Sequence, residues 1–235
     1  MKKSIAVDLH YFPNLEFFVA IAGADELVFF PEEKYQRQSF FNRTQIRLAN
    51  SVGTLSVPIK GRRPRIAQDK IQIDYDQNWM NIHLRSIQSA YGKAPFYEYY
   101  FPYFEKIFLQ HHENLWRLNW EMLTICLKLL GFSVKMGIHK SFQEQSWTAD
   151  IRGELKPSAP FSERPYYLPE PYFQLFGLDF DPNLSILDLL FCEGPAAQSI
   201  LLKSAKNYEQ SAKGLCFQNK FGNIRTDILN NQIGI

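Results

Sequence analysis

The stretch that decides the fold of this chain is SIAVDLHYFPNLEFFVAIAGADELVFF, residues 4–30. Residues 4–10 are largely apolar, with polar side chains arriving at the end, and they predict a strand. Asn14 has the character of a helix N-cap, and residues 15–22 carry apolar side chains at helical spacing. Residues 27–30 form a continuous apolar run, which is typical of a buried parallel strand. The stretch therefore predicts a βαβ unit.

The rest of the chain extends this unit. Hydrophobic periodicity and capping residues predict strands at residues 55–59, 71–73 and 132–138, long helices that begin near Trp79, Pro95 and Leu115, and short helices at residues 185–191 and 195–202. We therefore expect an α/β fold with a mostly parallel sheet. A helical segment, a proline-rich loop and short C-terminal helices should follow the N-terminal βαβ unit.

Residues 139–171 hold five prolines and little periodicity. A stretch of this length is either an ordered, ligand-facing excursion or a flexible linker, and both interpretations stay open. We expect three segments. Residues 1–138 form the α/β core with its helices, residues 139–203 pack the loop and C-terminal helices on the same domain, and residues 204–235 are a polar tail with the composition of a mobile segment.

Several classes of protein are disfavoured by what the sequence lacks. The apolar runs are too short for a membrane span, and no secretory signal pattern opens the chain. Three widely spaced cysteines form neither a zinc nor a disulfide pattern. No glycine-rich phosphate loop, GxSxG or HExxH motif is present. We expect a cytoplasmic protein without a metal or a bound cofactor.

Charge is unevenly distributed, although the net charge is only +2. Eight basic and no acidic residues lie between Lys34 and Gln68. They form either a solvated rim or a cradle for an anionic small molecule. Nucleic acid is the weaker alternative, because no nucleic-acid-binding motif accompanies the charge.

The end of the first strand offers the first candidate site. Asp8 and His10 lie two residues apart, hence on one face of a strand, and a helix N-terminus follows. Ligands of open α/β sheets bind off the carboxyl ends of the strands, and a carboxylate can orient an imidazole for catalysis. The alternative is an edge strand whose polar residues face solvent.

His83 is the second candidate. It shares a helix face with Trp79, Ile87 and Ala90, so it should point inward. A lone inward histidine is more often a satisfied core residue, but its ordinary pKa near 6.5 suits a proton carrier.

The segment YQRQSFFNR, residues 35–43, is the third candidate. It interleaves aromatic rings with Gln38, Asn42 and Arg43, whose amide and guanidinium groups suit a carboxylate or a phosphate. Capping by Asn42 is the structural alternative.

These stretches resemble, in order, the motifs of the WbqC-like family of bacterial proteins. The resemblance is carried by Tyr11–Phe12–Pro13, Tyr35–Gln36–Arg37–Gln38–Ser39 with Asn42–Arg43, the strand from Leu55 to Lys60, the block Trp79, His83, Ile87, Tyr91 and Ala94–Pro95–Phe96, the trio Tyr172, Gln174 and Phe176, and the sequence PNLSILDLLF at residues 182–191. It implies a role in synthesis or decoration of surface polysaccharides such as O-antigen.

Two functions from different classes remain open. One is a transferase that moves an acyl or aminoacyl group onto a nucleotide- or carrier-linked amino sugar. Its roles would fall to His83 as general base, Arg43 and Lys60 as anion binders, Tyr35, Gln38, Asn42, Tyr91 and Gln174 as substrate contacts, and Asp150 with Arg152 as a closing loop. The other is a non-catalytic binding protein for a phosphorylated metabolite. A cysteine nucleophile is a third option, but Cys126 and Cys192 lie on apolar helix patterns that favour inert burial.

Overall fold

The computed structural model describes residues 2–61, 66–139, 147–177 and 179–206. The polar tail predicted at residues 204–235 therefore lies almost entirely outside the described residues. None of the helices in these ranges combines the length and apolar character needed to cross a bilayer.

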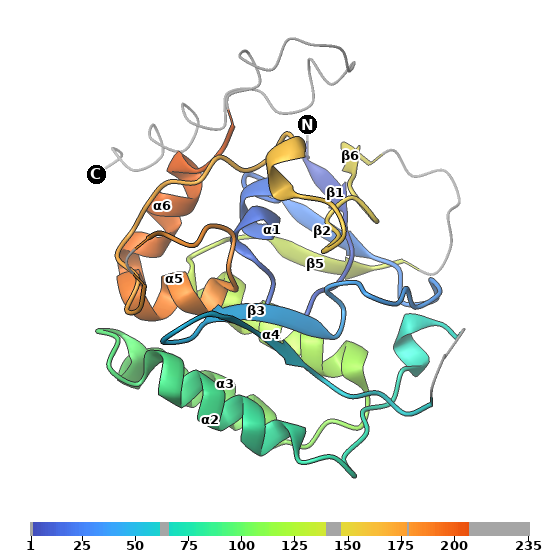
Figure 1. The fold of residues 1–235 in the computed structure, drawn as a ribbon. Helices are drawn as coiled ribbons and strands as arrows, with labels where there is room; N and C mark the ends of the chain where they lie inside the picture. Colours follow the sequence, from blue (N-terminus) through green and yellow to red (C-terminus); the bar gives the residue numbers. More distant parts are fainter. Residues whose placement is uncertain (1, 62–65, 140–146, 178, 207–235) are drawn as a thin grey trace.

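A parallel sheet lies at the centre of the fold (Figure 1). Its strands are β1 (Ser4–Ala6), β2 (Glu26–Phe29), β5 (Lys135–Ile138) and β6 (Ala149–Asp150), in the order β5-β2-β1-β6. Every pairing in this sheet is parallel, with Ile5 opposite both Leu27 and Ala149. The α/β class and the mostly parallel sheet predicted from the sequence are thus confirmed.

Helix α1 (Leu15–Ala20) joins β1 to β2 and completes the predicted βαβ unit. The Asn14 side chain accepts the Phe17 N–H at 3.1 Å, as expected of an N-cap. Just before it, Phe12 adopts the left-handed region at φ 41°, which is unusual for a bulky residue. Hydrogen bonds from the hydroxyls of Thr44 and Ser185 to the Phe12 carbonyl hold this turn in place.

A separate antiparallel pair of strands, β3 (Arg43–Arg47) and β4 (Val52–Ser56), follows β2. Strand β3 was not predicted from the sequence, and the strand after it was predicted three residues too late. The predicted strand at residues 71–73 was also wrong. That segment follows the short 3-10 turn η1 (Gln68–Lys70) and makes only isolated bridges, because its partners Ile59 and Asn114 lie on different segments.

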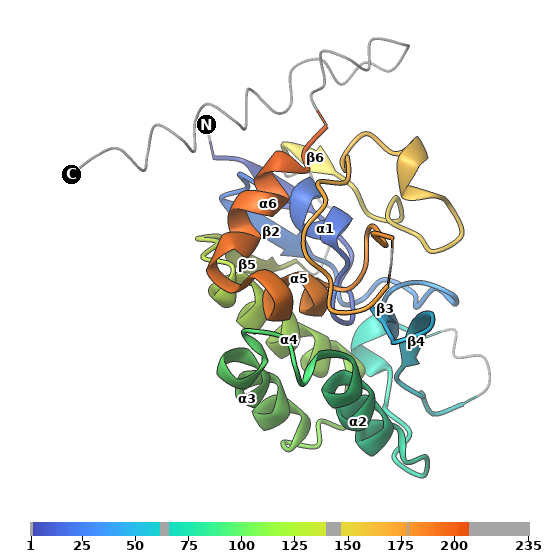
Figure 2. The same cartoon turned by 60° about the vertical axis from the view of Figure 1, so that its left-hand side comes forward.

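Three long helices follow: α2 (Trp79–Tyr91), α3 (Tyr97–Phe108) and α4 (Leu115–Leu129). Figure 2 shows α2 and α3 on the outside of the molecule, with α4 between them and the sheet. The C-terminal part holds the 3-10 turns η2 (Phe161–Glu163) and η3 (Gly194–Ala196), and the helices α5 (Ile186–Glu193) and α6 (Ala197–Lys203).

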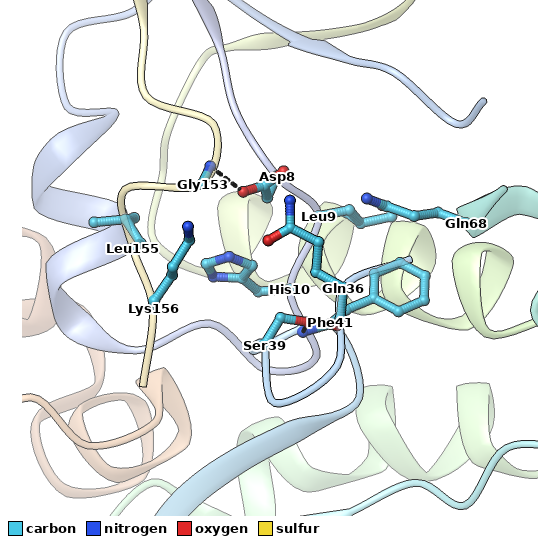
Figure 3. Close-up of a pocket in the computed structure, with 10 residues that line it drawn as sticks. All are labelled: Asp8, Leu9, His10, Gln36, Ser39, Phe41, Gln68, Gly153, Leu155 and Lys156. Atoms are coloured by element: carbon cyan, nitrogen blue, oxygen red, sulfur yellow. Dashed lines mark hydrogen bonds between the residues drawn. The ribbon is translucent and has the colours of Figure 1, made fainter. Parts of the chain in front are cut away.

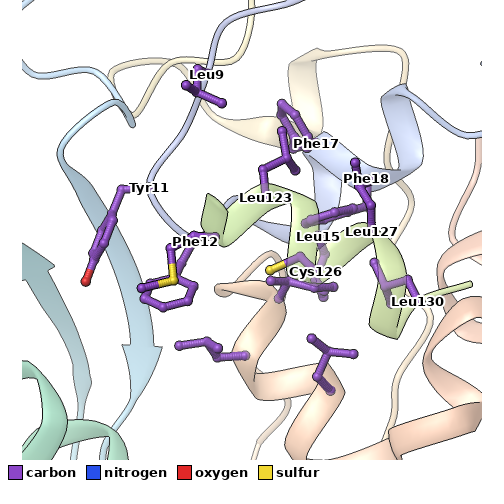
Figure 4. Packing of buried hydrophobic residues seen from close by; sticks show 14 of the residues in the cluster. Leu9, Tyr11, Phe12, Leu15, Phe17, Phe18, Leu123, Cys126, Leu127 and Leu130 are labelled. Atoms are coloured by element: carbon purple, nitrogen blue, oxygen red, sulfur yellow. The ribbon is translucent and has the colours of Figure 1, made fainter. Parts of the chain in front are cut away.

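The main hydrophobic core lies between the sheet, α1, α4 and α5. Figure 4 shows the chain after β1 passing along it, with Phe12 on the side of Cys126 of α4 and Tyr11 pointing the other way. Phe29 of β2 packs edge-on against Trp116 and Trp120 of α4. Because residues from β1 through α6 share this one cluster, the N-terminal unit and the C-terminal helices pack together.

A buried ion pair fastens the irregular segment after β6 to the N-terminal unit. Glu16 of α1 has a fully buried side chain, and Arg164 donates to both of its carboxylate oxygens, at 2.6 and 2.5 Å. Arg164 also donates to the backbone carbonyls of Lys156 and Ala159. A single guanidinium therefore links α1 to the loop around Lys156.

Loss of this guanidinium should strongly destabilise the fold. Arg164→Met leaves the Glu16 carboxylate buried without its partner, so the free energy of unfolding should fall by about 3–5 kcal/mol. Urea unfolding followed by circular dichroism measures this change. The matched control is Arg117→Met, which breaks an exposed pair with Glu121 and should cost no more than about 1 kcal/mol. Equal losses of unfolding free energy in the two variants would contradict the stabilising role given to the buried Arg164–Glu16 pair.

Candidate functional site

The candidate site lies where the strand order of the parallel sheet reverses. From β1 the chain continues to β2 on one side, whereas β6 lies against the other side of β1. The carboxyl ends of β1 and β6 are therefore adjacent but lead into different connections. Open parallel sheets bind ligands in the crevice at such a point. A pocket lies here, about 340 Å³ in volume when its open mouth is included.

Three segments distant in sequence form the pocket walls (Figure 3). The lining residues are Asp8, Leu9 and His10 after β1, Gln36, Ser39, Phe41 and Gln68 between β2 and α2, and Gly153, Leu155 and Lys156 after β6. Most of these side chains can donate or accept hydrogen bonds, so the pocket suits a polar ligand.

Asp8 is one of the two predicted residues that reach the pocket. Its Oδ2 atom accepts the Gly153 N–H at 2.6 Å. Burial raises the pKa of the carboxyl group above its ordinary value, while the Gly153 hydrogen bond and the charge of Arg152 oppose this shift. A carboxylate with a raised pKa at a pocket wall is a suitable general base.

His10 is the other. It is only 2% exposed, and its ring contacts Phe17 and Phe40 at centroid distances of 5.1 and 5.4 Å. The Nδ1 atom has no hydrogen-bond partner in the described part of the chain. Burial and the charge of Arg164 lower the pKa of the imidazole to about 3. The ring is therefore neutral at physiological pH and acts as a hydrogen-bonding group rather than as a cation.

Lys156, Gln36 and Gln68 were not predicted from the sequence. Lys156 is exposed and extends beside His10 toward Asp8 (Figure 3). Its charge lowers the pKa of Asp8. Gln36 belongs to the YQRQS segment of the third candidate site, in which Gln38 rather than Gln36 was the predicted contact. Gln38 is exposed at φ 56° and is not part of the lining.

Asp150 and Arg152 lie beside the pocket rather than in its lining. Arg152 pairs with Asp150 at 2.5 Å and with Glu33, and its guanidinium lies 4.2 Å over the Phe30 ring. These contacts fix the loop after β6 against the end of β2. Gly153 follows at φ 70°, a conformation that suits glycine, and presents its N–H to Asp8.

His83 lies outside the pocket lining. It is 3% exposed, a hydrogen bond of 2.9 Å joins its Nδ1 to the Tyr11 hydroxyl, and its ring packs against Trp79. Burial lowers the pKa of the imidazole to about 4, and a hydrogen bond to the Ser56 backbone opposes this shift. These properties favour the satisfied-core alternative for His83.

Arg43 pairs with Ser56 in the β3–β4 register, and the Ser56 backbone is hydrogen-bonded to His83. Its Nε atom is buried and has no partner among the described residues. The neighbouring Tyr35 hydroxyl donates to Asn42, which itself donates to the Val57 carbonyl, so Asn42 has a structural role. Lys60 is exposed. None of these four predicted residues lines the pocket.

Tyr91 and Gln174 belong to a second, buried polar network. Gln174 donates to Asp188 of α5 at 2.9 Å, and Tyr172 donates to the same carboxylate at 2.6 Å. The Tyr91 hydroxyl accepts the Arg47 N–H. Burial raises the pKa of Asp188, and the hydrogen bonds from Tyr172 and Gln174 oppose this shift. The network lies apart from the pocket and fastens α5 to the segment before it.

Neither cysteine candidate has an activated thiol. Cys126 is fully buried in α4, and burial raises the pKa of its thiol. Burial raises the pKa of the Cys192 thiol to about 12. Within the described ranges, no group of three or more His, Cys, Asp or Glu side chains is placed to hold a metal ion.

The fold and site define an α/β protein with a polar pocket at the reversal point of a parallel sheet. A profile of the WbqC-like protein family matches residues 9–157, which include every lining residue except Asp8. The chain belongs to this family. It is also 26% identical over 232 residues to the uncharacterized protein Rv1507c of Mycobacterium tuberculosis, covering 86% of this chain and 98% of the relative. No solved structure matches the chain.

The buried imidazole of His10 should make the protein sensitive to acid. Its pKa is about 3 in the fold and near 6.5 when unfolded, so stability is present above pH 6.5 and is lost as the pH falls toward 3. Lowering the pH from 6.5 to 5 should reduce the free energy of unfolding by about 1.5 kcal/mol through His10 alone. Urea unfolding at both pH values should show that this drop in the free energy of unfolding is smaller in His10→Leu than in the native protein. An identical loss in both proteins would contradict the neutral buried state.

Proposed function

We propose that this protein is a transferase that moves an acyl or aminoacyl group onto the amino group of a nucleotide- or carrier-linked sugar. The family resemblance supports the setting in surface polysaccharide synthesis. The observation that carries the proposal is the Asp8 carboxylate in a polar pocket at the reversal point of the sheet. A sugar with several hydroxyl groups would find matching donors and acceptors there.

Asp8 would be the general base of this reaction. Its Oδ2 atom is engaged by Gly153, which leaves Oδ1 for the substrate. A neutral amine is the nucleophile that suits this carboxylate best, because the carboxylate can accept the single proton that the nitrogen loses as the amide forms. His10 cannot share this task near neutral pH, since its pKa is about 3.

The donor would be an activated ester or thioester of the acyl group. The exposed cations Lys34, Arg37 and Lys60, on the stretch that supplies Gln36 and Ser39 to the pocket, would attract the phosphates of a nucleotide- or carrier-linked acceptor. The non-catalytic alternative uses the same pocket to hold a phosphorylated metabolite. It would show binding without turnover.

Removal of the Asp8 negative charge tests the proposal directly. We expect Asp8→Asn to lower the rate of acyl transfer at least about 100-fold, because general-base catalysis contributes on this scale. Mass spectrometry of a panel of nucleotide-linked amino sugars incubated with acyl and aminoacyl donors measures product. Asp76→Asn, an exposed carboxylate outside the pocket lining, is the control and should keep full activity. Full activity in Asp8→Asn would exclude the proposed base.

The sequence predicted His83 as the general base, and this role is tested separately from that of Asp8. The burial of His83 and its bond to Tyr11 lead us to expect that His83→Gln lowers stability, while the rate of the folded enzyme changes less than about threefold. The same transfer assay, normalised to folded protein, measures this difference. A His83→Gln loss as large as that of Asp8→Asn would return the role of base to His83.

A further inference from the structure

Two polar groups that line the pocket, a lysine ammonium and an imidazole nitrogen, form no hydrogen bond with any of the described residues. Among the residues that the structure describes, the Lys156 ammonium forms no ion pair and no hydrogen bond. His10 Nδ1 is also unpartnered, although the side chain is 98% buried. Both groups line the pocket with Asp8 (Figure 3). A buried polar atom without a partner is unusual and requires an explanation.

The fold also holds Lys156 in this place. Arg164 donates to the Lys156 carbonyl and is itself fixed by the buried Glu16, so the Lys156 backbone is tied to α1. The ammonium lies beside Gly153, since a Cβ atom built on this glycine would be in ordinary van der Waals contact with Lys156 Nζ, at 3.5 Å. The cation therefore lies against the glycine whose N–H binds Asp8.

We propose that Lys156, with His10 beside it, binds the carbonyl oxygen of the group that is transferred. This inference rests on the proposed function, and it assigns the half of the reaction that Asp8 does not perform. A general base and a group that stabilises the developing oxyanion both accelerate acyl transfer to an amine, and a carboxylate and a cation on the walls of one small pocket can supply them.

The step balances with an ester or thioester donor. The amine nitrogen forms a bond to the carbonyl carbon, and the carbonyl π electrons move to the oxygen beside Lys156. The tetrahedral adduct then collapses, the bond from carbon to the leaving oxygen or sulfur breaks, and an amide forms. Asp8 takes the proton from the nitrogen and returns it to the leaving group. Lys156 stabilises the oxyanion without exchanging a proton.

Acetate is a probe of the oxygen site that requires no knowledge of the substrate. In protein labelled with ¹³Cε-lysine, we expect acetate to shift the Lys156 resonance in a saturable manner. That resonance is assigned by its absence from Lys156→Met. Asp8→Asn should tighten acetate binding at least about threefold, because it removes a neighbouring negative charge. The exposed Lys93 supplies the internal control. A Lys156 shift no larger than that of Lys93 would overturn the proposal.

The transfer assay separates this inference from the proposed function. We expect Lys156→Met to lower kcat about 100-fold, with the KM of the amino sugar changed less than threefold, because the lost interaction exists mainly in the transition state. Lys156→Arg should recover part of kcat. Transfer that proceeds at the normal kcat in Lys156→Met would reject the oxygen site and keep the transferase. Acetate binding without any transfer would reject the transferase and keep the oxygen site.

Discussion

The buried ion pair between Arg164 and Glu16 is the interaction on which the pocket depends. Glu16 is on the first helix and Arg164 lies 148 residues later, yet the two side chains meet in a bidentate contact. The same guanidinium binds the carbonyl oxygens of Lys156 and Ala159. A chain that crosses from β6 to η2 without regular structure is thereby held against the carboxyl end of β1. The entropy of ordering this segment is offset by charge-assisted hydrogen bonds rather than by a backbone ladder.

Local sequence signals predicted the elements whose formation depends on local interactions. The Asn14 cap and the apolar spacing after it determine α1, and the helix positions of α2 to α4 follow from the same periodicity. The elements that were predicted wrongly are those whose formation depends on pairing with distant parts of the chain. The two residues of β6 form a strand because β1 offers a free edge, not because of their own propensity. The alternating apolar residues Ile71 and Ile73 are buried, as their pattern indicated. Burial alone does not supply a neighbouring strand to pair with, so this segment makes only isolated bridges.

The same distinction explains the site. Asp8 and His10 were predicted because polar residues are unusual at the end of an apolar strand, although β1 ends at Ala6 and the two residues follow it rather than sharing a strand face. Lys156 gave no such signal, since it lies among prolines without periodicity and reaches the pocket only through β6 and Arg164. Tyr91 and Gln174 came from the family motifs, which do not distinguish a substrate contact from a buried structural group. In the fold they belong to the network around Asp188, and their contact with a substrate stays a prediction.

Access to a pocket separates the two polar clusters. The Oδ2 atom of Asp188 accepts bonds from Tyr172 and Gln174, which offset part of its burial cost, whereas its Oδ1 atom is buried without a partner among the described residues. His10 Nδ1 is likewise buried without a partner among the described residues, and an unsatisfied buried group costs about 1–3 kcal/mol. A leucine there would fit a core better than this imidazole. His10 lines a pocket that a ligand can enter, whereas Asp188 is not among the residues that line it, and this makes the pocket, rather than the Asp188 network, the place to expect binding.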